Sequence, residues 1–127
     1  MTDLDLARRA VACKHWKWMP GMRLVCFDGD DAARICTIKG EGLVGVRRES
    51  GIMAAYDGEA WPDCTDPATV GCLLALVRAA WGDPYLTVDI CGVEDHRVWA
   101  CYSCDLIAHA YGDTEAAALV AALEAAP

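Results

Sequence analysis

The clearest pattern of apolar and polar positions lies in residues 61–84, where it predicts a complete helix with both ends marked. Apolar side chains recur there at steps of three and four residues and form one stripe: Val70, Leu73, Leu74, Val77 and Trp81. Asp66 is placed to cap the first turn, and Pro67 suits the first helical position because no backbone donor is needed there. Gly82 and Pro84 then mark the end of the helix. Because the other positions are also poor in polar side chains, we expect this helix to be covered on more than one side.

Similar patterns predict two further helices and a series of short strands. The helices cover residues 2–15 and the C-terminal residues from 114 onward, and the strands are predicted over residues 22–28, 34–39, 43–48, 51–56, 85–91, 97–103 and 106–111. Residues 57–65 are predicted to form a loop. Short turns imply antiparallel pairing, and each helix must bury an apolar stripe. The predicted fold class is therefore α+β, with antiparallel sheets layered with three helices in a helix–sheet–helix sandwich, and residues 1–127 are expected to form a single domain.

Composition and the first residues of the chain indicate the cellular compartment, because they argue against a membrane or a secreted protein. Hydrophobic residues make up 55% of the chain, yet no apolar run approaches the ~20 residues that span a bilayer. The first residues carry acids ahead of Arg8 and Arg9, without the apolar region of a secretory signal. We therefore expect a soluble intracellular protein that does not contact a membrane. In that compartment most of the eight cysteines should be reduced, and many should serve as small apolar residues of the core.

Charge is divided unevenly along the chain. The first 48 residues contain nine of the eleven basic residues and six acids, whereas residues 49–127 contain two basic and thirteen acidic residues. Such an excess of carboxylates repels nucleic acid and attracts basic proteins over a Debye length of about 8–10 Å. The chain is therefore expected to bind a protein with a basic surface. The alternative is that the acidity only keeps a rather apolar domain soluble.

The residues expected to contact a partner combine two tryptophans with acidic positions: Trp16, Trp18, Asp57, Glu59, Asp63, Glu94 and Asp95. Around the tryptophans, aromatic side chains alternate with the cations Lys17 and Arg23, a composition that single-strand nucleic-acid binders use. In an extended segment Trp16 and Trp18 would point to opposite faces, so one ring in the core and one at the rim is the favoured arrangement. Together with the overall acidity, this argues against direct nucleic-acid binding.

Three segments carry a resemblance to a known group of proteins. They are A-C-K-H-W-K-W-M-P-G-M at residues 12–22, P-D-C-T-D-P-A-T-V-G-C-L-L-A-L-V-R-A-A-W-G-D-P at residues 62–84, and T-E-A-A-A-L-V-A-A-L-E-A-A-P at residues 114–127. Taken together they resemble small phage and prophage proteins of the phage alpha-beta-alpha sandwich type. The resemblance implies a helix–sheet–helix sandwich encoded by a mobile element, and it transfers no catalytic residue, since most such proteins have no assigned activity.

Zinc binding is the alternative function, because Cys101 and Cys104 have a C-x-x-C spacing. Cys91, His96 and His109 are near enough in sequence to complete four ligands. Residues three apart on a continuous strand face opposite sides of the sheet, so chelation would need a turn at residues 102–103. No second C-x-x-C supplies the other half of a closed site. The preferred function therefore involves no cofactor, and zinc would be the cofactor only if the chain is a zinc-binding module.

An enzyme of unknown substrate is the third hypothesis. Ser103, Asp105 and His109 have the side-chain types of a hydrolase triad, but they fall within seven residues and lack the glycine pattern of a nucleophile elbow. The preferred function is therefore a non-enzymatic binding protein of phage or prophage origin. We expect it to act in the bacterial cytoplasm as an acidic modulator or inhibitor of a host protein, such as a nuclease or a defence complex. Alanine-rich faces on the central and last helices also leave a homodimer open.

Overall fold

The computed structural model describes residues 2–28, 32–38, 44–47, 53–55, 59–92 and 94–127. It contains three helices, named α1 (Asp3–Ala12), α2 (Pro67–Trp81) and α3 (Glu115–Ala125). The ends of α2 agree with the sequence prediction, because Asp66 accepts a hydrogen bond from the Thr69 N–H and Gly82 ends the helix in the left-handed conformation. Helix α1 ends at Ala12, three residues earlier than predicted. No helix in the described part of the chain is long and apolar enough to cross a membrane.

One antiparallel sheet has the strand order β4-β3-β2-β1-β5. Its strands are β1 (Arg23–Asp28), β2 (Ala32–Ile38), β3 (Val44–Arg47), β4 (Met53–Ala55) and β5 (Glu59–Pro62). The prediction of a loop over residues 57–65 is wrong at β5, which pairs with β1 through partners such as Val25 and Trp61. Four residues are too few to show an alternating pattern, and Pro62 is tolerated because β5 is an edge strand. Residues 29–31, which lie between the first two predicted strands, are outside the described residues.

The second antiparallel sheet comes from the C-terminal part of the chain and has the order β6-β7-β8. Its strands are β6 (Thr87–Cys91), β7 (Val98–Tyr102) and β8 (Ala108–Gly112), and the short helix η1 (Glu94–His96) lies between β6 and β7. All three strands fall within segments that the sequence predicts as strands, apart from the last residue of β8. Both of its connections are short, which explains the antiparallel pairing.

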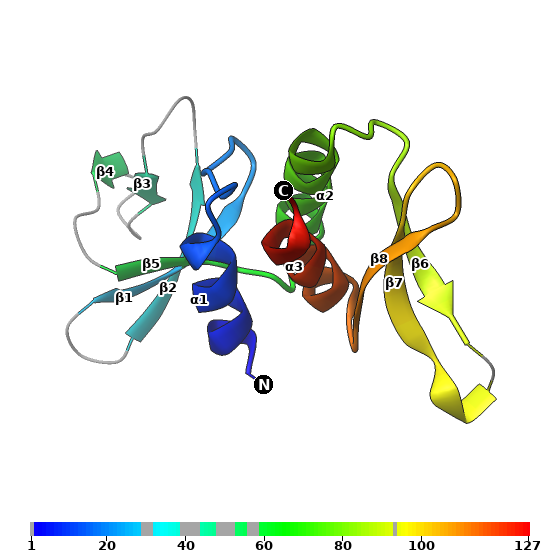
Figure 1. The fold of residues 1–127 in the computed structure, drawn as a ribbon. Coiled ribbons are helices and arrows are strands. Elements are labelled where there is room, and N and C mark those ends of the chain that lie inside the picture. The colour runs from blue at the N-terminus through cyan, green and yellow to red at the C-terminus, as the bar shows by residue number, and fades with distance from the viewer. Residues whose placement is uncertain (1, 29–31, 39–43, 48–52, 56–58, 93) are drawn as a thin grey trace.

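The two sheets lie on opposite sides of the α2 and α3 helices, and α1 lies beside the five-stranded sheet (Figure 1). The predicted α+β class, with antiparallel sheets layered with three helices, is confirmed, but the order of the layers differs from the predicted helix–sheet–helix sandwich, because α2 and α3 form a central layer between the two sheets. The largest fully buried apolar side chains come from both central helices, from residues around the start of β1 and from the residue before β6: Met22, Leu24, Leu73, Val77, Leu86, Leu119, Val120 and Leu123. The Trp81 indole N–H donates to the Ala122 carbonyl at 2.9 Å and joins α2 to α3.

Candidate protein-binding site

Large apolar side chains are exposed in one region of the described structure. Among residues whose side chains the structure describes, they are Tyr85, Ile90, Leu106, Ile107 and Tyr111. All five belong to the three-stranded sheet or to the segments that enter and connect its strands. Scattered single apolar residues are normal on a protein surface, but a group of them in one unit is typical of an interaction site.

Leu106 and Ile107 belong to the tight loop that joins β7 to β8. The Ser103 N–H donates to the Ile107 carbonyl at 2.8 Å, and the Leu106 N–H donates to the Ser103 carbonyl at 3.0 Å. The Ser103 Oγ accepts a further hydrogen bond from the Ile107 N–H at 3.1 Å. Within this closed loop Leu106 has a φ of 62°, the only positive φ found at a described residue other than glycine. A position that favours glycine or asparagine thus holds a leucine that is 83% exposed.

Asp83 ties this loop to the connection between α2 and β6. Its Oδ2 accepts from the Cys104 N–H at 3.0 Å, and its Oδ1 accepts from the Tyr85 N–H at 3.0 Å. The hydrogen bond from Cys104 has the largest effect in lowering the pKa of the Asp83 carboxyl below its usual range, and the one from Tyr85 adds to it. One carboxylate therefore fixes two surface segments beside each other. We name their exposed side chains, Tyr85, Leu106 and Ile107, the apolar tip.

The face of the three-stranded sheet that points away from α3 adjoins the apolar tip. Gly112 lies against the first turn of α3, and its register partner Trp99 shares that covered face. Alternate residues therefore form the uncovered face, namely Thr87, Asp89, Cys91, Val98, Tyr102 and Tyr111, whereas Ala100 in the middle strand is fully buried. A hydrogen bond with the Cys91 side chain raises the pKa of Tyr102 to about 12, so this hydroxyl stays protonated and neutral. The uncovered face thus offers aromatic and small apolar groups.

The segment that carries the apolar tip is acidic, and Asp83 and Asp105 adjoin the apolar tip itself. Residues 82–113 contain six acids, namely Asp83, Asp89, Glu94, Asp95, Asp105 and Asp113, and Arg97 is their one lysine or arginine. Among the five of these acids whose side chains the structure describes, which leaves out Glu94, none forms an ion pair with a basic side chain. The acidic excess predicted for the later part of the chain is therefore concentrated, in sequence, around the exposed apolar side chains.

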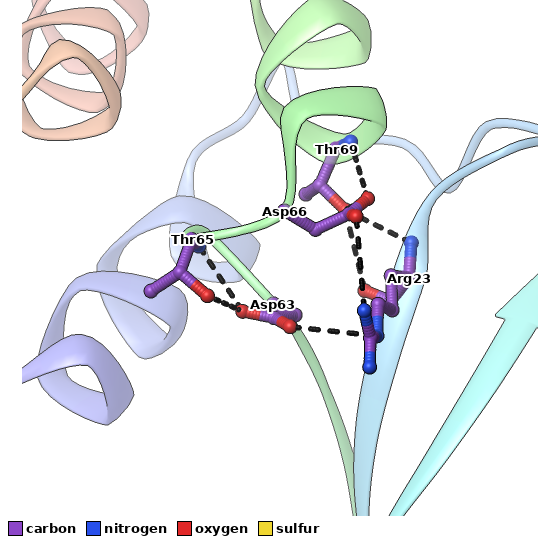
Figure 2. Close-up of polar contacts among 5 residues, drawn as sticks. All are labelled: Arg23, Asp63, Thr65, Asp66 and Thr69. Atoms are coloured by element: carbon purple, nitrogen blue, oxygen red, sulfur yellow. Dashed lines mark hydrogen bonds and ion pairs between the residues drawn. The ribbon is translucent and has the colours of Figure 1, made fainter.

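Other predicted acidic positions take part in internal contacts. Figure 2 shows Asp63 and Asp66 beside Arg23, and their carboxylate oxygens lie 3.7 Å and 4.0 Å from its side-chain nitrogens. Asp63 also accepts hydrogen bonds from the backbone and hydroxyl of Thr65 at 3.1 Å and 2.6 Å. The buried Thr69 hydroxyl accepts from the Arg23 N–H at 2.9 Å, so the cluster joins β1 to the start of α2. These contacts give Asp63 a structural role that requires no partner protein.

The remaining acids of the predicted partner surface divide by location. Asp57 lies outside the described residues, and the backbone of Glu59 lies in β5. Glu94 and Asp95 lie in η1, where Asp95 is exposed. Glu124, near the end of α3, forms an ion pair with Arg9 of α1. The carboxylates nearest the N-terminal arginines are therefore partly neutralised, unlike those around the three-stranded sheet.

The structure brings the predicted Trp16 and Trp18 together. Their ring centroids are 5.2 Å apart with an interplanar angle of 83°, and both rings pack partly buried against the core. The Trp16 indole nitrogen is buried without a hydrogen-bond partner in the described structure. Two rings in edge-to-face contact with each other are not separate stacking platforms for successive bases.

The cysteines considered for zinc lie in different environments. Cys101 is fully buried in the core, and this burial raises the pKa of its thiol to about 11, whereas Cys104 is exposed in the loop after β7. The chain turns at residues 104–106, and therefore not at residues 102–103 between the two cysteines. No group of three or more histidines, cysteines and carboxylates suited to a metal occurs among the described residues.

The side chains considered for a hydrolase triad also have separate roles. Ser103 closes its own loop through the hydrogen bond from Ile107, and Asp105 is exposed beside Leu106. His109 stacks on Trp81, with the ring centroids 3.9 Å apart and an interplanar angle of 13°. This stacking places the imidazole against the central helix, and no hydrogen bond among the described residues joins it to Ser103 or Asp105.

The apolar tip was not among the predicted site residues. Its one signal in the sequence is Asp105-Leu106-Ile107, an acidic and apolar run without glycine where two strands must reverse direction. Comparisons of the chain with protein-family models, with curated proteins and with solved structures give no match. The candidate site is therefore defined by its geometry and charge.

Proposed function

We propose that this chain is a non-enzymatic binding protein that inserts its apolar tip into an apolar depression with a basic rim on a partner protein. In the favoured setting the chain comes from a phage or prophage, and the partner is a host protein such as a nuclease or a defence complex. The sequence resemblance supports that origin. The chemistry of the apolar tip and its carboxylates supports the kind of partner.

The observation that supports this proposal most directly is the state of Leu106. This residue has a left-handed backbone conformation, and 83% of its surface is exposed. Such a conformation costs a leucine about 1–2 kcal/mol relative to a right-handed one. In the monomer, burial of this exposed side chain contributes little free energy to offset that cost. Residues that break a local rule without gain to the fold are expected at functional sites, where a partner supplies the compensating contact.

The size of the apolar tip suits a specific but reversible contact. Full burial of an aliphatic or aromatic side chain is worth about 1.5–3 kcal/mol, so Tyr85, Leu106 and Ile107 together can contribute several kcal/mol. The loop is already fixed by its own hydrogen bonds and by Asp83, so less conformational entropy is lost on binding. The adjoining carboxylates Asp83 and Asp105 would raise the association rate with a basic surface and make it dependent on salt.

Affinity capture with matched variants tests this function. Wild-type protein, Leu106→Asp and Ala75→Asp would each be used to capture partners from a bacterial host, with the retained proteins identified and quantified. Ala75 is exposed on α2, so its substitution adds the same charge away from the apolar tip. We expect one identified protein to be retained by wild type and Ala75→Asp, lost with Leu106→Asp, and retained less at high salt. Equal retention by all three variants would contradict the proposed function.

A further inference from the structure

A basic cleft lies between the segment that follows α1 and the last turns of α2. It has a volume of about 360 Å³ and is lined by Lys14, His15, Trp16, Lys17, Leu76, Ala79 and Ala80. The cations come from the first segment, while α2 contributes only apolar side chains to the floor. The cleft therefore suits a ligand that carries both a negative charge and an aliphatic group.

The lysines of the basic cleft are available for such a ligand. Lys14 and Lys17 are exposed, and neither forms an ion pair with an acid among the described residues. The cleft lining contains no carboxylate. His15 differs from them, since its Nε2 lies 2.8 Å from the Pro127 carbonyl oxygen. On a chain with a net charge of −8, this is a local concentration of unpaired positive charge beside an apolar floor.

The basic cleft and the apolar tip adjoin the same end of the same helix. Ala79 and Ala80, in the last turn of α2, line the cleft. Gly82 ends that helix, and Asp83 fixes the apolar tip through its two hydrogen bonds. The connection that leads out of α2 and the loop between β7 and β8 lie at the same end of the molecule in Figure 1. One end of the protein thus offers an acidic apolar projection and a basic apolar recess.

We propose that this end binds a second copy of the chain in a symmetric dimer, with Asp105 and Leu106 of each protomer in the basic cleft of the other. A two-fold axis makes each contact occur twice, and it requires both complementary surfaces to lie on one face. The Asp105 carboxylate meets Lys14 and Lys17, and the Leu106 side chain covers the alanine and leucine floor. This goes beyond the proposed function, because the dimer holds the apolar tip that a host partner would otherwise bind.

Sedimentation velocity over a range of protein concentrations tests the dimer. We expect a monomer–dimer equilibrium at low salt that shifts toward monomer at about 1 M salt, where the Debye length is about 3 Å. Lys17→Glu and Asp105→Lys should each weaken dimerisation by roughly fivefold or more, because each places like charges in contact. The double variant carrying both changes restores opposite charges and should dimerise again.

Two control variants match these charge changes elsewhere on the surface. Arg97→Glu corresponds to Lys17→Glu and Asp113→Lys corresponds to Asp105→Lys, and both positions are exposed and absent from the cleft lining. Neither control should change the dimerisation constant more than about twofold. A monomer at all concentrations up to roughly 1 mM, or a dimer that all four variants weaken equally, would overturn the inference. If the dimer is absent while Leu106→Asp still abolishes partner capture, the proposed function stands and only the dimer is refuted.

Discussion

The Leu106→Gly substitution separates what this side chain contributes to folding from what it contributes to binding. Leu106 has a φ of 62° and is 83% exposed, so glycine removes backbone strain and takes little from the core. Relief of the left-handed conformation should stabilise the fold by about 1–2 kcal/mol. The loop hydrogen bonds use backbone atoms and the Ser103 hydroxyl, and these remain in the variant.

Two smaller effects oppose this gain. About a sixth of the Leu106 side chain is buried, and because full burial is worth about 1.5–3 kcal/mol, its removal costs about 0.3–0.5 kcal/mol. Glycine also gives the unfolded chain more freedom, which costs about 0.4–1 kcal/mol. The terms nearly cancel. The free energy of unfolding should therefore stay within about 1 kcal/mol of the wild-type value, with a small stabilisation as the central expectation.

Urea denaturation followed by circular dichroism measures this change. Leu73→Ala is the comparison, because Leu73 is fully buried and its truncation should cost about 2–5 kcal/mol. Leu106→Gly should keep the wild-type stability and still lose the captured partner. A loss of more than about 1.5 kcal/mol for Leu106→Gly would show that the leucine supports the fold, and the reasoning for a functional tip would fail.

Further predictions concern the core and its polar contacts. Thr69→Val should lower the free energy of unfolding by about 1–3 kcal/mol in urea, because the Arg23 N–H loses its buried acceptor at 2.9 Å; an unchanged midpoint would contradict this role. Gly112→Ala should cost about 1–3 kcal/mol, since a Cβ there would lie 2.4 Å from a backbone nitrogen of α3; wild-type stability would mean that α3 is not packed as described. Burial raises the pKa of Cys101 to about 11, so its contribution to stability is complete below the ordinary thiol pKa of about 8.5 and is lost as pH rises through 11. Unfolding midpoints at pH 8 and about 10.5 should differ less in Cys101→Ala than in wild type, and an equal difference in both proteins would contradict this effect of burial.

The sequence predicts the helices well, because their signals are local. Asp66 and Thr114 cap their helices through the backbone N–H three residues later, which is a relation between near neighbours in the chain. Strand β5 depends instead on pairing with β1, some 35 residues earlier, and residues 59–62 alone carry no alternating pattern. A short edge strand of this kind is visible only once its partner is placed.

The candidate site was harder to predict for a similar reason. The sequence shows that the acidic residues are concentrated in the C-terminal part of the chain. The pairing of Arg9 with Glu124 and of Arg23 with Asp63 is set by the fold. Exposure of Leu106 depends on the loop geometry between β7 and β8, which places a leucine where glycine is usual. An apolar residue in a sequence is expected to be buried, so its exposure is information that only the structure adds.

Site-specific photo-crosslinking tests the central claim, that the apolar tip is the surface that binds a partner protein. A photoreactive amino acid would replace Leu106 in one preparation and the exposed Ala75 in another, and both would be illuminated in host cells. We predict that position 106 becomes joined to one host protein, at a peptide where apolar residues lie beside lysine or arginine, and that position 75 does not. The same products from both positions, or attachment of position 106 to many unrelated proteins, would contradict the account.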